Sequence, residues 1–428
     1  MNSLFESSEH LVEAGQHPEA RKALLTALSE AIAGADAYAA VRSAVNREGE
    51  NLRVGNLFTH ISRVREIAFV AAGHAALPMA SALVAALGDS VTQGLVLTSV
   101  GEAPDLPFQI RRVTEATLPS SEGSLAATEA LELASGLKTG DLFLPLLSPG
   151  SLGMLATPEE GVTLEVLRTE VSRALTSDPS GPLSSEVAGA LSRAQGGKLA
   201  GAAGQATVEA LVVERGEGAA WIGGGPASRP ASGSGGHVRS FLEESGTWQR
   251  LPSPLKERIE GGERLQERAP RGVHVVSIEG PREALESAGA ACGQAKHRPT
   301  LLWVHDTSPP GTVAHRFVKE AETALRRPLP KGFRGNAALA GLTLGLPEGV
   351  VREEPLREFL ETARRELRRR DVTIALLQTA GSVGSGKEMC VGMVDAESAP
   401  AYSSMRGGFT DVGTIAVAWK TVTPGPNT

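Results

Sequence analysis

Residues 66–98 read EIAFVAAGHAALPMASALVAALGDSVTQGLVLT, and this stretch decides the fold class. The apolar run 66–72 ends at Gly73, residues 75–87 have a helical composition, and 94–98 form a second short apolar run. Short apolar runs that alternate with helical segments are typical of strands buried on both faces of a parallel sheet. The stretch therefore predicts a strand–helix–strand unit within an α/β fold.

The same alternation continues on both sides of this unit. Further strands are expected at 108–113, 141–147 and 207–213, and helices at 18–45, 125–137, 163–176 and 185–200. Ligands of such sheets bind beyond the carboxyl ends of the strands. We therefore expect any active site in the loops that follow Ala72, Thr98, Leu147 and Val213.

The second half of the chain is also expected to be α/β. Strands are predicted at 274–278, 300–304, 372–377, 389–394 and 414–419, and helices at 310–326 and 356–370. Between the halves, residues 223–236 (GGGPASRPASGSGG) read as a flexible linker. Net charge also changes there, from −10 over residues 1–230 to +3 over residues 231–428. We therefore expect two domains, 1–230 and 231–428.

Composition excludes several function classes. The 428 residues include 41% hydrophobic and 21% charged residues, which is ordinary for a soluble globular protein. Only 10 Phe, 4 Trp and 2 Tyr are present, and the net charge is −7, which argues against nucleic-acid binding. No apolar run approaches the ~20 residues of a membrane span, and no export signal is visible. Two cysteines fit a reducing compartment, so a cytoplasmic location is expected.

Several segments resemble, in the same order, those of class II glycerate 2-kinases. Residues 190–200 (ALSRAQGGKLA) are similar to that family's His-Leu-Ser-Xaa-Val-Lys-Gly-Gly-Arg-Leu-Ala, and 147–151 (LSPGS) to its Leu-Ser-Gly-Gly-Gly/Ala-Ser turn. The resemblance implies an N-terminal Rossmann-like parallel sheet with helices on both faces. It also implies a C-terminal α/β domain like the leucine-rich MOFRL domain, at about 298–428.

The polar positions that the resemblance assigns to catalysis are degenerate in this chain. They fall on His74, Ser99, Pro149, Ala188, Gly189 and Arg215. His74 replaces a lysine that, in the family, contacts the transferring phosphoryl group. Histidine is mostly neutral near pH 7, so the fixed positive charge of the lysine is lost. Pro149 replaces a glycine of the turn, and proline has no N–H to donate to a phosphate oxygen. Catalytic residues therefore stay unassigned.

The C-terminal half retains only part of the expected polar set. Asp306 can replace one family acid, and Arg334 and Asn336 are kept, whereas the family's loop with three aspartates reads AGSVGSGKE at 380–388. Mg²⁺ in phosphoryl transfer is held by carboxylates and substrate phosphates, so no metal or cofactor is predicted. Residues 381–388 nearly match a phosphate-binding P-loop, but Glu388 replaces its hydroxyl residue and a strand follows it, which favours a plain loop.

Three hypotheses about function stay open. The first is a glycerate 2-kinase-like protein that has lost phosphoryl transfer and acts through protein interaction or regulation. The second is an active ATP-dependent kinase of glycerate or a related hydroxy acid, and the third is a non-catalytic sensor of a small carboxylate or nucleotide. The candidate ligand-binding residues are Ser148, Gly150, Ser151, Lys198, Asp306, Arg334, Asn336 and Lys387. A protein partner is expected to contact Arg364, Arg365 and Arg369, in a basic cluster predicted at a helix end.

Overall fold

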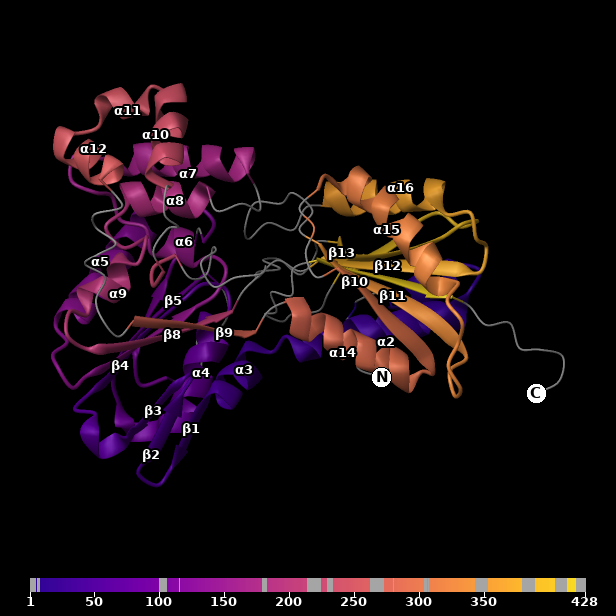
Figure 1. Cartoon of the computed structure of the whole chain (residues 1–428), viewed down its shortest axis with the longest axis horizontal. Coiled ribbons are helices and arrows are strands. Elements are labelled where there is room, and N and C mark those ends of the chain that lie inside the picture. Colours follow the sequence, from indigo (N-terminus) through magenta and orange to yellow (C-terminus); the bar gives the residue numbers. More distant parts are fainter. Residues whose placement is uncertain are drawn as a thin grey trace.

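Two sheet-containing bodies lie side by side, and a small third sheet extends from the first (Figure 1). The computed structural model describes residues 5, 8–99, 106–114, 116–178, 183–213, 225–228, 234–261, 273–279, 281–303, 306, 308–342, 353–378, 389–404 and 414–420. Both large sheets have six strands.

The first sheet is parallel throughout. It consists of β4 (Ile67–Ala72), β5 (Val91–Thr98), β6 (Gln109–Arg112), β7 (Leu142–Leu147), β8 (Thr207–Val213) and β9 (Val273–Glu279). Their spatial order is β6-β5-β4-β7-β8-β9, so the chain direction across the sheet reverses between β4 and β7. This reversal is the topological switch point, where doubly wound folds bind ligands. The predicted Rossmann-like sheet is confirmed.

Alternate residues of β4 face two different helix layers, which explains its unbroken apolar sequence. Ala68, Val70 and Ala72 share a core with α5 (Ser121–Ser135) and α9 (Lys198–Ala202). Ile67, Phe69 and Ala71 share another with α3 (Ala37–Ala44) and α4 (Ala76–Leu87). All six residues of β4 are buried. Two short 3₁₀ turns, η1 (Ile61–Arg63) and η2 (Gly88–Ser90), also belong to this body.

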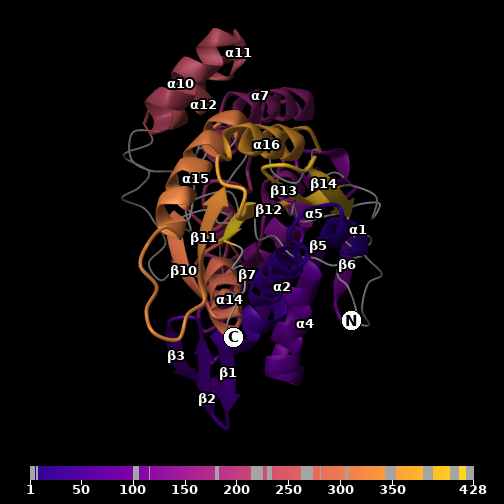
Figure 2. The same cartoon turned by 90° about the vertical axis from the view of Figure 1, so that its right-hand side faces the viewer.

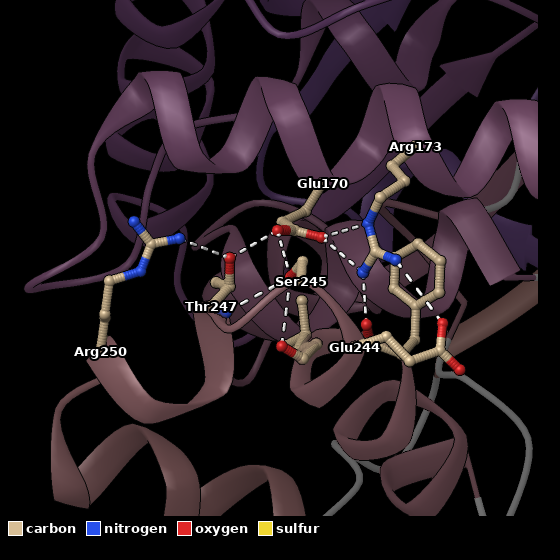
Figure 3. A network of polar contacts seen from close by, with 8 residues as sticks. Glu170, Arg173, Glu244, Ser245, Thr247 and Arg250 are labelled. Carbon is tan, nitrogen blue, oxygen red and sulfur yellow. Dashed lines mark hydrogen bonds and ion pairs between the residues drawn. The ribbon is translucent and has the colours of Figure 1, made fainter.

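A separate helical layer covers one end of the first sheet. It contains α6 (Ser151–Met154), α7 (Leu164–Ser177), α8 (Leu183–Leu191), α10 (Ser234–Glu244), α11 (Thr247–Arg250) and α12 (Ser253–Glu260). Buried Glu170 of α7 accepts hydrogen bonds from Ser245 Oγ (2.7 Å) and Thr247 Oγ1 (2.5 Å) and pairs with Arg173 (Figure 3). This network joins α7 to α10 and α11.

The second sheet is mixed. Its strands are β10 (His297–Trp303), β11 (Gly335–Leu342), β12 (Val372–Gln378), β13 (Met389–Asp395), β14 (Ala401–Ser404) and β15 (Thr414–Lys420), in the order β10-β11-β15-β12-β13-β14. Among the described strand pairs of this sheet, β10–β11 is parallel and the others are antiparallel. One face packs on α15 (Pro310–Leu325) and α16 (Glu353–Glu366). The other packs on α2 (Pro18–Gly34) and α14 (Pro281–Gln294), with α1 (Ser8–Glu13) beside α2.

The two bodies are interleaved in sequence, so their division differs from the expected boundary at residue 230. Strand β9 follows that boundary yet joins the first sheet, whereas α2 precedes it yet packs on the second. Figure 2 shows α2 next to α14, with which it covers one face of the second sheet. Strand pairing and helix packing of this kind depend on contacts between residues far apart in sequence. Local periodicity therefore carries no information about them.

Two local expectations also need correction, and one small sheet was not expected. The helix expected at 18–45 is two helices, α2 and α3, because Asp36 begins a new helix by accepting the N–H of Tyr38 (2.9 Å). The helix expected at 185–200 is likewise divided into α8 and α9 by the left-handed residues Gly196 and Gly197. A hairpin sheet, β1 (Val45–Glu48), β2 (Asn51–Val54) and β3 (Leu57–His60), was not expected.

In the described part of the chain, no single helix is long and apolar enough to cross a membrane. Helices α2 and α3, bent by 44° at their junction, meet that test only when taken together.

Candidate functional site

Two loops meet at the switch point of the first sheet, one after β4 and one after β7. The N–H of His74 donates to the carbonyl oxygen of Pro149 at 2.9 Å, and the N–H of Ala75 donates to Ser148 Oγ at 3.0 Å. The N–H of Ser151, at the start of α6, donates to the carbonyl oxygen of Ser148 at 3.1 Å. Backbone N–H groups at helix N-termini bind phosphate when they point at the ligand. These three are hydrogen-bonded within the protein.

The close approach of the two loops depends on a glycine in each. Gly73 has φ of +112°, and a Cβ there would lie 2.3 Å from Ser148 Oγ. Gly150 has φ of +93°, and its Cβ would lie 3.0 Å from His74 Nε2. Glycine adopts such positive φ values without a steric penalty. The two glycines thus let the loops pack directly on each other.

The His74 side chain lies inside the protein and does not extend into solvent. It is only 3% exposed, and its ring lies beside Gly150. Its Nδ1 lies 3.4 Å from Ser99 Oγ, at the end of the neighbouring strand β5. Two degenerate positions, His74 and Ser99, therefore meet at the expected place. Neither supplies a fixed positive charge for a phosphate.

Lys198 is committed to structural contacts. Its Nζ donates to Glu159 Oε1 (2.7 Å) and to the carbonyl oxygens of Gly189 (2.7 Å) and Ser192 (2.6 Å). An ammonium group has three donors, so all of them are used. Burial lowers the pKa of Lys198, partly offset by Glu159. Burial alone would raise the pKa of Glu159, but Lys198 and Arg258 outweigh it and lower that pKa. The lysine holds α9 against the end of α8.

Helix α8 contains two of the degenerate catalytic positions, and neither carries a positively charged side chain. Ala188 and Gly189 are buried, and Gly189 allows Gly196 to approach so closely that a Cβ on Gly196 would lie 3.0 Å from its Cα.

The start of α8 contains polar groups that sequence reasoning missed. Burial raises the pKa of Glu186, and its Oε2 lies 4.0 Å from His237 Nδ1. The hydroxyls of Ser184 and Ser185 are buried and have no hydrogen-bond partner within the described part of the chain. No motif pointed to Glu186, because His237 belongs to α10, which follows only after residue 233.

The C-terminal candidates are not brought together. Asp306 precedes α15 and pairs with Arg316 at 2.7 Å. Asn336 donates to the carbonyl oxygens of Leu325 and Arg327, at the other end of the same helix. A helix of 16 residues is about 24 Å long, so Asp306 and Asn336 lie at opposite ends of it. Arg334 is exposed near Asn336.

Two of the site residues named from the sequence, Arg215 and Lys387, lie outside the described residues, as does the 380–388 loop. Among the residues that are described, no three His, Cys, Asp or Glu side chains are placed to hold a metal ion. The N–H groups of His74, Ala75 and Ser151 at the switch point already donate to oxygen atoms of Ser148 and Pro149. The described residues therefore do not fit the MgATP that the resemblance implies.

The basic cluster at the end of α16 is partly neutralised. Arg369 forms a bidentate pair with Asp371 (2.9 and 2.6 Å), and Arg370 pairs with Glu397 (2.7 Å). Arg365 donates to Thr362 Oγ1 within its own helix, and both Arg364 and Arg365 are exposed. Arg364 and Arg365 are thus the most accessible charges of the three proposed for a partner.

Comparison with known proteins places the chain in a family. The family described as "Domain of unknown function (DUF4147)" matches residues 23–260, more than half of the chain. A glycerate 2-kinase of Pyrococcus horikoshii is 33% identical over 156 residues, which are 36% of this chain and 34% of that protein. A D-glycerate 2-kinase of Thermotoga maritima is 34% identical over 116 residues, or 27% and 28% of the two chains. The matched segments thus span about a third of each curated relative.

Solved structures agree over nearly the whole length. A crystal structure of a glycerate kinase from Thermotoga maritima has a TM-score of 0.72, with 20% identity and coverage of 94% of this chain and 99% of that one. A crystal structure of a Pyrococcus horikoshii OT3 protein has a TM-score of 0.69 with the same identity and coverage. At this identity the likeness concerns the fold. The chain belongs to the DUF4147 family and is a glycerate 2-kinase-like protein.

Proposed function

We propose that this chain has lost ATP-dependent phosphoryl transfer and acts as a regulatory or protein-binding member of its family. The main support is the hydrogen bonding between the two loops at the switch point. The N–H groups of His74, Ala75 and Ser151 donate to atoms of the opposite or the same loop. A phosphate could reach them only after those bonds break. Preorganised donors aimed at developing charge supply most of the rate enhancement in such reactions, and here they are occupied.

The alternative of an active kinase gains little support from the residues on which it depends. It would need Lys198, Asp306 and Asn336, and each of these side chains makes structural contacts. Asp306 and Asn336 are also separated by the length of α15. Lys387 and Arg334 are the remaining cations for this alternative, and Arg334 is exposed.

A steady-state assay tests the proposal. Full-length protein, MgATP and D-glycerate are incubated, and ADP release is compared with a blank that lacks protein. The D-glycerate 2-kinase of Thermotoga maritima serves as the positive control for the assay. We expect no release above the blank. Turnover that Lys387→Ala or Arg334→Ala abolishes would contradict the proposal, because the activity would then belong to this chain and not to a contaminant.

The sensor alternative predicts binding without turnover. Titration calorimetry with D-glycerate, and separately with ATP, would detect it, and we expect no binding heat from either compound. A saturable heat that Lys198→Met leaves unchanged would point to a small-ligand site away from that lysine.

We propose that a protein partner contacts Arg364, Arg365 and Arg369. We also propose a cytoplasmic location and a MOFRL-like region at about 298–428. The exposed guanidinium groups of Arg364 and Arg365 support the contact, because such charges accelerate encounter with an acidic surface. The test compares proteins captured by the wild-type chain and by the triple alanine variant, at low and physiological salt. Identical sets at both salt concentrations would contradict the proposed surface.

A further inference from the structure

The loop between α15 and β11 carries a concentrated positive charge. Residues 326–334, the basic loop, read RRPLPKGFR and include four cations and no acid. All four cations are exposed: Arg326, Arg327, Lys331 and Arg334. The basic loop follows the end of α15 that is remote from Asp306, on the side of the second body that faces away from the first (Figure 1). It is therefore separate from the candidate site at the switch point.

The protein around the basic loop holds its backbone in place. The buried side chain of Asn336 donates to the carbonyl oxygens of Leu325 (3.2 Å) and Arg327 (2.8 Å). Arg298 Nη1 donates to the carbonyl oxygen of Pro328 at 3.3 Å. A loop that is already ordered loses little conformational entropy when it binds a partner. Asn336, which was a candidate ligand-binding residue, thus shapes the basic loop instead.

The charge of the basic loop is not balanced by nearby acids. Glu322 accepts hydrogen bonds from Arg326 (3.3 Å) and from the N–H of Arg368 (3.2 Å), just beyond the end of α16. The other three cations of the loop form no ion pair with any described residue. Elsewhere on the same body arginines are paired, as Arg316 is with Glu320 (2.9 Å). Unbalanced like charges repel one another, and an acidic partner would relieve that repulsion.

Helix dipoles account for only part of this pattern. A cation near the last turn of a helix stabilises its negative end, and Arg326 directly follows α15. Lys331 and Arg334 lie well beyond the end of α15 at Leu325, and the effect of the dipole falls off within the last turn. The stability of α15 therefore does not explain the second half of the basic loop.

An apolar side chain lies in the middle of these charges. Leu329 is 44% exposed, and prolines on both sides of it restrict the backbone. A single exposed leucine is ordinary on a protein surface. Among unpaired cations on an ordered loop, however, it offers a partner an apolar contact and several charged contacts at one place.

We propose that the basic loop binds a short acidic segment of a partner protein, and that an apolar side chain of this segment covers Leu329. This inference deepens the protein-binding role proposed above and rests on it. Through Glu322 and Arg368 the basic loop adjoins the end of α16, so it extends the surface that contains Arg364 and Arg365. Arginine side chains match the geometry of carboxylates. A short segment is favoured over a long polyanion, because the whole chain has a net charge of −7 and repels one.

Fluorescence anisotropy of a labelled peptide tests the charged contacts. The probe is a short peptide that repeats Glu-Asp-Leu, and it is titrated with the full-length chain at low and at physiological salt. Arg327→Glu/Lys331→Glu should raise the dissociation constant about tenfold or more and weaken its dependence on salt, because two attractive charges become repulsive.

The matched control changes the net charge by the same amount at a different place. Lys22→Glu/Lys138→Glu reverses two exposed lysines outside the basic loop. It should raise the dissociation constant by less than about twofold, because salt screens charges beyond about 10 Å. Thermal melts of both double variants should match the wild type, since all four side chains are exposed.

A second peptide, in which serine replaces each leucine, tests the apolar contact. Leu329→Ser should weaken binding of the leucine peptide about threefold or more and leave binding of the serine peptide unchanged. Equal losses with both peptides would contradict a contact between Leu329 and the apolar side chain.

Carbodiimide cross-linking locates the bound peptide. The reagent couples a peptide carboxyl to a lysine amine as an amide and takes up the water that is released. Lys331 is the only lysine of the basic loop, and mass spectrometry of a digest should identify it as the main site. Lys331→Arg keeps the charge but has no amine to couple, so it should retain the affinity and lose the cross-link.

Absence of saturable peptide binding at low salt, or equal affinities of the wild-type chain and Arg327→Glu/Lys331→Glu, would overturn the proposal. Vesicles that contain phosphatidylserine give the competing outcome: if the basic loop binds them and not the peptide, it contacts a membrane surface instead. The proposed function fails separately, because ATP turnover by the chain would contradict it whatever the peptide does. A chain without turnover that ignores the peptide would lose only this surface.

Discussion

The backbone N–H of His74 donates to the carbonyl oxygen of Pro149 at 2.9 Å, which links the two loops at the switch point. The next N–H, that of Ala75, is taken by Ser148 Oγ. The first turn of a helix leaves its N–H groups without partners inside the helix, and a phosphate is one way to satisfy them. Here the facing loop satisfies them, so the fold can keep this crevice without binding a phosphate.

His74→Lys alone will not restore glycerate phosphorylation. A catalytic constellation acts as a unit, so one restored cation has no partners to act with. We also expect a loss of stability, because the imidazole that it replaces is only 3% exposed and packs on Gly150. A glycerate-dependent ADP assay and a thermal melt check the two parts. Robust activity from this single change would mean that the remaining site is intact.

Gly150→Ala is expected to destabilise the chain more than Gly204→Ala. Both glycines have positive φ (+93° and +61°), so each alanine pays about 1 kcal/mol for the left-handed conformation. A Cβ at 204 meets nothing within 4 Å, whereas a Cβ at 150 lies 3.0 Å from His74 Nε2. Crowding should therefore cost about 1 kcal/mol more at position 150. Urea unfolding measures the difference in unfolding free energy between the two alanine variants. In a chain that also carries His74→Ala, this difference should disappear. If Gly150→Ala and Gly204→Ala destabilise the chain equally while His74 is present, the packing of His74 on Gly150 is contradicted.

Lys198→Met should destabilise the chain by about 2–4 kcal/mol, because it leaves Glu159 and two carbonyl oxygens without this donor. Lys138→Met, at an exposed lysine, is the control and should change the unfolding free energy by less than about 0.5 kcal/mol. Urea unfolding of both variants decides the matter. If stability is unchanged but binding of ATP or glycerate is lost, Lys198 is a ligand-binding residue.

The Arg21–Asp395 ion pair (2.9 Å) should make stability depend on pH below about 4. Burial alone would raise the pKa of Asp395, but hydrogen bonds from Ser398 and Arg21 outweigh it and hold the pKa below its ordinary value. A carboxyl with a lowered folded-state pKa contributes stability above its unfolded pKa of about 3.9, and that contribution is lost as pH falls through the folded pKa.

The double variant Arg21→Met/Asp395→Leu tests this pair. It should lose part of the acid dependence, while Asp395→Leu alone should cost about 3–5 kcal/mol at pH 7 because it leaves a buried guanidinium unpaired. Urea unfolding from pH 3 to pH 7 measures both effects. An unchanged slope below pH 4 in the double variant would show that other groups control acid unfolding.

Local sequence was sufficient to locate the strands of the first sheet, although it assigned β9 to the second domain. The short, mainly apolar runs at 66–72, 94–98 and 141–147 predicted β4, β5 and β7, because strands buried on both faces need no alternation. The loops after Ala72 and Leu147 followed from the same pattern, and they do meet at the switch point.

The features that the sequence did not predict, in the fold and at the candidate site, depend mainly on contacts between residues far apart in the chain. The hairpin β1–β3 was missed although Gly55-Asn56 is a turn signal, because the flanking strands have only four residues each. Strands β8 and β9 are separated by 59 residues, which carry no periodic signal for the pairing of the two strands. At the site, the sequence identified Pro149 as a lost donor. It could not show that the carbonyl of Pro149 accepts the N–H of His74.

A single-turnover assay of phosphoryl transfer is the most sensitive check that this chain lacks kinase chemistry. Full-length protein in excess over γ-labelled ATP, with Mg²⁺ and saturating D-glycerate, is sampled over hours for labelled phosphoglycerate, so that even slow chemistry would register. We expect no product beyond that of a protein-free sample, because the N–H groups at the switch point stay bonded within the two loops. Stoichiometric formation of phosphoglycerate by the wild-type chain would contradict it.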